Sequence, residues 1–230
     1  QLLQNVALGA AIIALPIFLH MVLEYNALET GLSLAPLSLT MFGVAVLAGK
    51  KAGTRRPSRL IRSGFALLAI GMVLLIVVVP RADSGWYLFL PLLIAGAGLG
   101  LLVSQLNNYT LSPISEERVS EAAGVNSASG SFGLSFGLAF AGAIMLATLS
   151  ITFTDMAKSS AVLSPTEQQQ VADGLDEDAE VMSNTALEEL LVGQPQDVQD
   201  EIIRINTEAR PFALQVALLV PLVAALLGLV

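Results

Sequence analysis

The sequence predicts an all-α integral membrane protein: a bundle of six transmembrane helices with a long helical extracytoplasmic hairpin before the last helix. Three observations lead to this prediction. Of the 230 residues, 54% are hydrophobic and only 13% are charged, whereas a soluble domain carries about 25% charged residues. Six apolar runs approach or exceed the roughly 20 residues that a helix needs to cross a bilayer. The positive charge is concentrated in one short segment between the second and third runs.

The six runs follow one another along the chain with polar breaks between them. The first contains His20 as its only titratable group, and the third is almost purely aliphatic. Four prolines lie inside runs, which membrane helices tolerate because neighbouring groups satisfy the freed carbonyls. We expect transmembrane helices over residues 1–23, 30–49, 63–80, 86–109, 124–150 and 211–230, the last one truncated. Because the chain begins without Met and ends inside an apolar run, we expect it to be a piece of a longer polypeptide.

The basic segment predicts which side of the membrane each loop occupies. The stretch "GKKAGTRRPSR" holds five of the 11 Lys and Arg residues of the chain: Lys50, Lys51, Arg55, Arg56 and Arg59. Lys and Arg in short loops mark the cytoplasmic side. We therefore expect a multi-pass protein of the cytoplasmic (inner or plasma) membrane, with residues 50–62 and 110–123 inside and residues 151–210 outside.

The outer segment, residues 151–210, is acidic but patterned. "SPTE" (Ser164–Glu167) is a capping box with Pro at the first helical position. Apolar spacing predicts short amphipathic helices around Leu187–Val192 and Val198–Ile205, the second running toward the last span. Asp173, Asp176 and Asp178 lack the Gly and distal Glu of a calcium loop. A solvated acidic face is therefore favoured over a metal site, and its charge could concentrate cations.

Two residues at the outer end of the first span are candidates for an outer gate. His20 and Glu24 are four residues apart, so they share a face if the helix continues through both. A hydrogen-bonded pair there could serve as a proton or cation site. The alternative is an interfacial His and Glu that both reach water.

A second group of candidates could line a substrate cavity. Thr40 and Ser135 lie near the estimated midplane, whereas Gln105, Asn107 and Asn108 lie near the inner end of the fourth span. The latter three could bond between helices, cap a helix end, or line the inner mouth of a cavity. Phe132, Phe136 and Phe140 form a stripe that either packs against a neighbour or lipid, or forms an aromatic wall for a flat or cationic ligand.

Glycines at a four-residue spacing predict close helix packing. They are Gly96 and Gly100 in the fourth span and Gly133 and Gly137 in the fifth. Small residues at this spacing let two backbones approach each other. The midplane surface is otherwise apolar, which suits amphipathic substrates better than sugars or amino acids. The spans hold no nucleophile–base pair, no cysteine and no cluster of metal ligands, so we expect neither an enzyme nor a metal or organic cofactor.

Two stretches resemble the C-terminal half of a major facilitator superfamily transporter. They are "LPIFLHMVLEYNALETGLSLAPLSL" (Leu15–Leu39) and "AGAGLGLLVSQLNNYTLSPISEERVSEAAGVNSASGSFGLSFGLAFAGA" (Ala95–Ala143). With the outer hairpin at 151–210 they are similar to the fourteen-span drug:proton antiporter branch, the EmrB/QacA-like group. The resemblance implies that the first, second, fourth and fifth spans lie nearest the cavity, and that the third and sixth face lipid.

The resemblance also implies a role for the basic segment. It would be the second copy of the signature loop G-x-L-A-D-R-x-G-R, which Gly49, Ala52 and the Arg-rich tail match. Gly53 stands where that loop has its acid, so a topology signal is retained while an acid-to-base latch is not. The proton-binding acids would lie in a missing N-terminal bundle of the same chain.

We therefore expect part of a proton-coupled secondary transporter that exports amphipathic or lipophilic compounds by alternating access. Its partners would be the lipid bilayer, the N-terminal bundle and a small amphipathic substrate, with no nucleic acid, and the proton gradient would supply the energy. One alternative is an exporter of a lipid or another endogenous hydrophobic metabolite. Another is a membrane scaffold or sensor whose acidic outer segment binds a partner.

Overall fold

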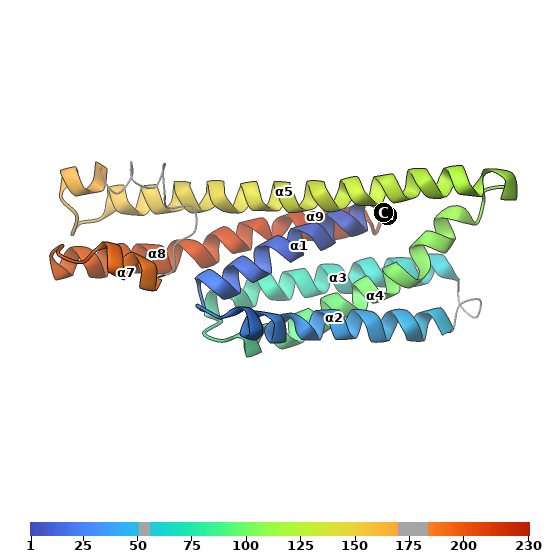
Figure 1. Ribbon diagram of the computed structural model, residues 1–230, viewed down its shortest axis with the longest axis horizontal. Coiled ribbons are helices and arrows are strands. Elements are labelled where there is room, and N and C mark those ends of the chain that lie inside the picture. Colours follow the sequence, from blue (N-terminus) through green and yellow to red (C-terminus); the bar gives the residue numbers. More distant parts are fainter. Residues whose placement is uncertain (51–55, 170–183) are drawn as a thin grey trace.

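The computed structural model describes residues 1–50, 56–169 and 184–230, and within these residues it contains helices and turns but no strand (Figure 1). Six of its helices are long and apolar enough to cross a membrane, which confirms the predicted six-helix membrane bundle. The α-helices are α1 (Leu2–Met21), α2 (Ala27–Lys50), α3 (Pro57–Val78), α4 (Phe89–Leu111), α5 (Val119–Ser159), α7 (Asn184–Leu190), α8 (Gln196–Ala217) and α9 (Leu219–Leu227). Short 3₁₀ turns, η1 (Val79–Arg81), η2 (Gly85–Leu88) and η3 (Glu116–Arg118), lead into α4 and α5.

The helices pack as two groups around a shared core. α1 lies against α5 and α9, whereas α4 lies against α2 and α3, and the contact between α3 and α9 joins the groups (Figure 1). The largest fully buried side chains come from both groups and include Phe18, Leu68, Met72, Leu92 and Leu214. Outside the lipid, removal of such apolar surface from water is the main contribution that stabilises the interior. Within the membrane, close packing between helices stabilises it instead.

All four predicted packing glycines lie at helix contacts. A Cβ at Gly133 would come 2.5 Å from the Leu2 carbonyl oxygen of α1, and one at Gly137 would meet the backbone of Val6. On the other side of the bundle, a Cβ at Gly100 would come 2.5 Å from the Met41 carbonyl oxygen of α2, and Gly96 meets Leu37 in the same way. Because glycine has only a hydrogen atom where other residues carry a Cβ, these positions allow the close approach of α1 to α5 and of α2 to α4.

Two helices, α5 and α8, extend well beyond the ends of α1 to α4 on the side that carries α7 (Figure 1). α5 has 41 residues, which at 1.5 Å per residue gives about 60 Å, twice the thickness of a hydrocarbon core. α8 runs beside it and passes through Pro211 to Ala217 without a break. The expected boundaries at residues 150 and 211 therefore fall inside helices. The apolar face of α8, with Ile202, Ile205 and Ala209 buried, continues the buried face of the membrane segment, which explains the continuity.

The expected local structure of the outer segment is confirmed where it is described. The Ser164 N–H donates to Glu167 Oε2 at 2.7 Å, and the Glu167 N–H donates to Ser164 Oγ, as a capping box requires. α8 contains the amphipathic helix predicted over Val198–Ile205, with Val198, Ile202 and Ile205 buried, and it continues to Ala217. α7 overlaps the other predicted helix only as far as Leu190, because the chain turns at residues 191–194 and leaves Leu190 and Val192 exposed. The three aspartates between 173 and 178 lie outside the described residues.

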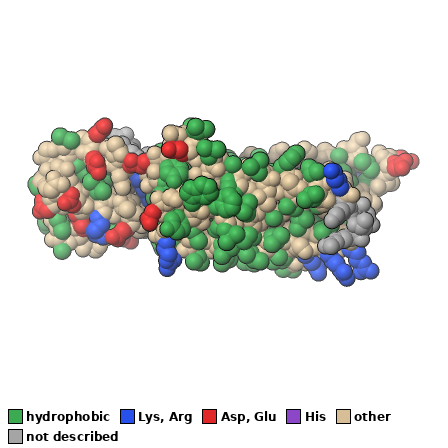
Figure 2. Space-filling view, turned by 90° about the horizontal axis from the view of Figure 1, so that it is seen from below, with side chains coloured by type: hydrophobic (Ala, Val, Ile, Leu, Met, Phe, Trp, Pro, Cys, Tyr) green, Lys and Arg blue, Asp and Glu red, His purple; other side chains and the backbone are tan. Residues whose placement is uncertain are grey.

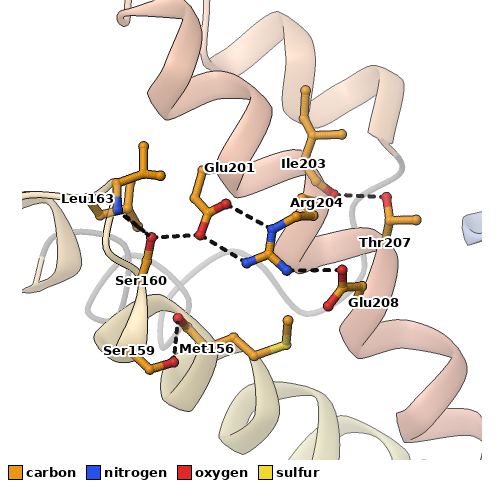
Figure 3. A network of polar contacts seen from close by, with 10 residues as sticks. Met156, Ser159, Ser160, Leu163, Glu201, Ile203, Arg204, Thr207 and Glu208 are labelled. Carbon is orange, nitrogen blue, oxygen red and sulfur yellow. Dashed lines mark hydrogen bonds and ion pairs between the residues drawn. The ribbon is translucent and has the colours of Figure 1, made fainter.

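A polar cluster joins the end of α5 to α8 (Figure 3). The Ser160 hydroxyl donates to Glu201 Oε1 at 2.6 Å, and the Arg204 guanidinium donates to both Glu201 and Glu208 at 2.9 Å. The Leu163 N–H donates to the Ser160 hydroxyl oxygen, which fixes the turn after α5. The described residues at the end of α5 and in α8 are therefore held together as an extension of the bundle.

Charge is distributed along the long axis of the molecule. In Figure 2 most of the visible Asp and Glu side chains lie at the end with α7 and α8, whereas most Lys and Arg side chains lie at the opposite end. A band of hydrophobic side chains lies between them. This is the pattern of a protein whose middle faces lipid and whose ends face water.

Candidate functional site

The main polar cluster near the membrane lies where α1 ends and the outer hairpin meets it. α1 stops at Met21, and Glu24 takes a positive φ of 53° in the turn that follows. The Glu24 carboxylate then accepts hydrogen bonds from the Thr185 hydroxyl at 2.6 Å and from the Thr185 N–H at 3.0 Å. These two bonds hold the first turn of α7 against the α1–α2 loop.

Arg210 of α8 makes the second connection to α1. Its side chain is only 7% exposed, and its Nη1 donates to the Met21 carbonyl oxygen at 2.6 Å. The carbonyls in the last turn of a helix have no partner within the helix and carry partial negative charge, so a guanidinium is well matched to this position. Apolar side chains surround its stem, among them Phe18 and Leu149, beside a small cavity of about 20 Å³.

Asn184 joins α7 to α8 and completes the cluster. Its Oδ1 accepts from the Asn206 amide at 2.8 Å, and its Nδ2 donates to the Thr207 hydroxyl at 3.0 Å. We refer to this set as the outer network, after the side of the membrane that the sequence predicts for it: Met21, Glu24, Asn184, Thr185, Asn206 and Arg210. The network links α1 to α7 and to α8, which continues into the last membrane segment. A movement of the C-terminal end of α1 must therefore either break these hydrogen bonds or move α7 and α8 as well.

The expected contact between His20 and Glu24 is not formed. His20 Nδ1 donates to the Tyr25 carbonyl oxygen at 2.7 Å, whereas Glu24 binds Thr185. The physical reason is that α1 ends between them, so an i,i+4 spacing no longer places them on one helix face. The Tyr25 hydroxyl accepts the Gly85 N–H at 2.9 Å, so the α1–α2 loop also contacts the turn before α4.

The outer network has a predictable pH dependence. The two hydrogen bonds from Thr185 lower the pKa of Glu24 below its ordinary value. A lowered folded-state pKa contributes stability that is present above about pH 4.3, the value for free Glu, and is lost as the pH falls through the folded-state value. We expect Glu24→Gln to reduce the free energy of unfolding at pH 7 by about 0.5–1 kcal/mol, because the group is exposed.

The test is thermal unfolding in detergent between pH 7 and pH 3. The difference between the parent and Glu24→Gln should shrink as the pH falls below about 4.3. Glu189→Gln, which alters an exposed acid on α7, is the matched control and should show no such difference. A constant difference across the range would contradict the assigned role of the Glu24 carboxylate.

The expected cavity residues do not converge on one site. Thr40 lines a crevice of about 620 Å³ between α2 and the start of α4, together with Tyr25, Glu29, Pro36, Trp86 and Phe89; we call this the α2–α4 crevice. Phe132, Phe136 and Phe140 stack on one another and line a separate groove of about 440 Å³ with Val6, Val220 and Val223; we call this the α5–α9 groove. The two spaces share no residue.

The remaining candidate cavity residues, Gln105, Asn108 and Ser135, line neither of these two spaces. Gln105 is buried, and its Nε2 donates to the Ala48 carbonyl oxygen at 3.4 Å, which corresponds to the interhelical alternative. Asn108 and Ser135 are exposed on α4 and α5. Periodicity shows which residues share a helix face but not the direction of that face, which is why the candidates separate in the fold.

The opposite end of the bundle, where α4 is followed by η3 and α5, is also polar. The Asn126 amide of α5 donates to Asn107 Oδ1 of α4 at 2.8 Å, and Arg118 pairs with Glu121 at 3.2 Å beside it. At the basic segment, Lys50 ends α2 and Arg56 precedes α3, with Arg59 exposed in its first turn. Lys51, Gly53 and Arg55 lie outside the described residues.

The outer network contains residues that sequence reasoning did not select. Arg210 carried a weak signal, because it is a lone Arg next to Pro211 where the last apolar run begins. Asn184, Thr185 and Asn206 carried none, since nothing in their local sequence distinguishes them from other solvated polar residues. In the described part of the chain, no group of three or more His, Asp and Glu side chains is placed to hold a metal ion.

The fold and the distribution of polar groups define a class of protein. A bundle of membrane-crossing helices with apolar flanks, in which Asp, Glu, Lys and Arg are restricted to the helix ends, is typical of membrane transporters. Sequence comparison specifies the class further. Residues 1–138 match the Major Facilitator Superfamily, and the chain belongs to that family. It is therefore a multi-pass membrane protein of the Major Facilitator Superfamily, and not an enzyme.

The chain is also similar to individual transporters. The probable actinorhodin transporter of Streptomyces coelicolor is 23% identical over 156 residues, which cover 66% of this chain and 27% of that protein. The uncharacterized transporter YebQ of Escherichia coli is 32% identical over 136 residues, covering 59% and 29%. The multidrug resistance protein Stp of Mycobacterium tuberculosis is 28% identical over 135 residues, covering 59% and 25%. The matched part thus spans between 25% and 29% of the length of each relative.

Proposed function

We propose that the chain forms one six-helix bundle of a proton-coupled exporter of amphipathic or lipophilic compounds. The observation that supports this most is the absence of ionisable side chains from the membrane-crossing parts of the helices, which leaves apolar walls and a few amides. Such walls bind apolar bodies without the convergent donors that sugars or amino acids need. Two relatives are named as a probable actinorhodin transporter and as a multidrug resistance protein, which agrees with this substrate class.

The surfaces of α2 and α5 support a second bundle as the partner. Thr30 is the one buried residue of α2, and the buried residues of α5 form a single narrow stripe. Large apolar side chains are therefore uncovered on both helices, among them Phe42, Val46 and Val125. Transporters of this type rock two bundles about a central site. We assign the chain to the C-terminal half of a fourteen-span protein of the EmrB/QacA-like group, in which the other half carries the proton-binding acids.

The charge distribution supports an orientation in the cytoplasmic membrane. Lys50, Arg56, Arg59 and Arg62 lie at the same end, and short basic loops are retained on the cytoplasmic side. Residues 50–62 and 110–123 would then be inside, and the acidic hairpin with α7 would be outside. The hairpin would surround the exit of the transport path, where the outer network lies.

Transport by the complete polypeptide that contains this chain tests the proposal. Ethidium is added to the outside of inverted membrane vesicles, and its accumulation inside them is followed with and without a proton gradient. We expect gradient-dependent accumulation that a protonophore abolishes. If folded and inserted protein shows no accumulation, multidrug export is excluded, and export of a lipid or hydrophobic metabolite, or a scaffold role, becomes the better explanation.

A further inference from the structure

α3 loses one backbone hydrogen bond near its C-terminal end because of a proline. In an α-helix each carbonyl oxygen accepts the N–H of the residue four positions further on, and Pro80 stands four positions after Ile76. Proline has no N–H, so the Ile76 oxygen has no donor within its own helix. α3 ends at Val78, and the 3₁₀ turn η1 with Pro80 follows it directly. The last turns of α3 therefore contain an acceptor that another group must satisfy.

Gln215 of α8 supplies a donor for this oxygen. Its Nε2 donates to the Ile76 carbonyl oxygen at 2.7 Å, across 139 residues of sequence. The surroundings are apolar, because Leu75, Val79 and Leu214 are each at most 1% exposed. A carbonyl oxygen without a partner is costly in such a setting. The bond between Gln215 and Ile76 therefore replaces a missing backbone bond rather than competing with an existing one.

The same compensation does not occur at the other prolines inside the long helices. Pro16 lies in α1, Pro36 in α2 and Pro211 in α8, and each of them also frees the carbonyl four residues earlier. Among the described residues, the Ile76 oxygen alone of these freed carbonyls accepts a hydrogen bond from a side chain of another helix. The position of Gln215 is therefore specific to the end of α3.

α8 makes a second bond of this kind five residues earlier in its sequence. Arg210 donates to the Met21 carbonyl oxygen at 2.6 Å, at the end of α1. At 3.6 residues per turn, side chains five residues apart point about 140° away from each other around the helix. Arg210 and Gln215 can therefore reach different neighbours, and α1 and α3 belong to the two different helix groups of the bundle.

We propose that Gln215 is a positioning residue that stands in for the N–H that Pro80 lacks, and that with Arg210 it makes α8 a clamp between the two helix groups. Each side of the clamp closes on a backbone carbonyl that its own helix cannot satisfy. α8 thereby ties the C-terminal ends of α1 and α3 to one helix that continues into the outer hairpin. This assignment goes beyond the proposed function, because it holds whatever compound the protein carries.

The substitution Pro80→Ala provides a direct test, because it restores an N–H four residues after Ile76. Pro80 is exposed, so the substitution removes little packing. Hydrogen exchange of residues 77–82 is followed by mass spectrometry in the complete polypeptide that contains this chain, well below its unfolding temperature. Gln215→Met keeps the length of the side chain and removes the donor, so we expect it to accelerate this exchange about threefold to tenfold. In the Pro80→Ala background the same substitution should change the exchange by less than about twofold.

Two control variants lie on the same helix. Gln199 is exposed, and its Nε2 donates to the Gln194 carbonyl oxygen within the hairpin. Gln199→Met should therefore leave the exchange of residues 77–82 unchanged in both backgrounds. Arg210→Met opens the other side of the clamp, so it should accelerate exchange at residues 22–25, after the end of α1, and leave residues 77–82 unchanged.

The outcomes that would overturn the proposal are defined by the two backgrounds. If Gln215→Met does not accelerate the exchange of residues 77–82, its amide does not hold the end of α3. If the acceleration is as large with Pro80→Ala as without it, Gln215 acts by packing and not by replacing the missing donor. Should Gln215→Met fail to fold, recovery of folding by Pro80→Ala would support the assignment, and failure to recover would contradict it.

Discussion

Replacing Arg210 with alanine is expected to destabilise the protein more than any other single change in the outer hairpin. The substitution removes a buried side chain that lines a small cavity together with Phe18 and Leu149, and it removes the hydrogen bond to the Met21 carbonyl oxygen. The loss of a buried charged hydrogen bond and of its packing lowers the free energy of unfolding by about 2–4 kcal/mol. For a chain of this size the unfolding midpoint should fall by about 5–10 °C.

Two further variants separate the effect of the lost packing from the effect of the lost hydrogen bond and charge. Arg210→Met keeps most of the stem and loses the hydrogen bond, so it should be less destabilising than Arg210→Ala. Arg204→Gln removes the same charge from the same helix, but Arg204 is exposed and pairs with Glu201 and Glu208 on α8, so it should lower the unfolding midpoint much less than Arg210→Ala does. Equal midpoints for Arg210→Ala and Arg204→Gln would show that Arg210 does not hold α8 to α1.

Replacing Gly137 with leucine is expected to separate α5 from α1. A Cβ at this position would lie 2.8 Å from Val6 Cα, and the atom it meets belongs to the backbone, which cannot move aside as a side chain could. Gly9 on α1 is equally tight against Leu138, at 3.0 Å from its nitrogen. Overpacking of this kind costs about 3 kcal/mol or more.

Gly124 supplies the control on the same helix. A Cβ there would meet nothing within 4 Å, so Gly124→Ala should be neutral or stabilising by up to about 1 kcal/mol, because Ala favours the helix. Gly137→Ala should still destabilise by about 1–3 kcal/mol. The measurement is thermal unfolding of both variants in the same detergent. If Gly124→Ala and Gly137→Ala behave alike, the close approach of α1 and α5 does not depend on Gly137.

The sequence alone determined that the chain is a membrane protein, that it has six membrane-crossing helical segments, and that its acidic and basic residues lie in different loops. These properties depend on the length of apolar runs and on where charges occur, and both can be counted along the chain. The packing glycines and the capping box at Ser164–Glu167 were also predictable, because each depends on a spacing of three or four residues within one helix.

The tertiary structure decided which side chains meet. Arg210 contacts a carbonyl 189 residues away, and Glu24 binds Thr185 across 161 residues, so no local pattern could pair them. His20 and Glu24, although only four residues apart, separate because α1 ends at Met21. Thr40 and the Phe132–Phe140 stripe line different spaces because the rotation of each helix about its own axis is set by packing against its neighbours, which periodicity within one helix does not contain.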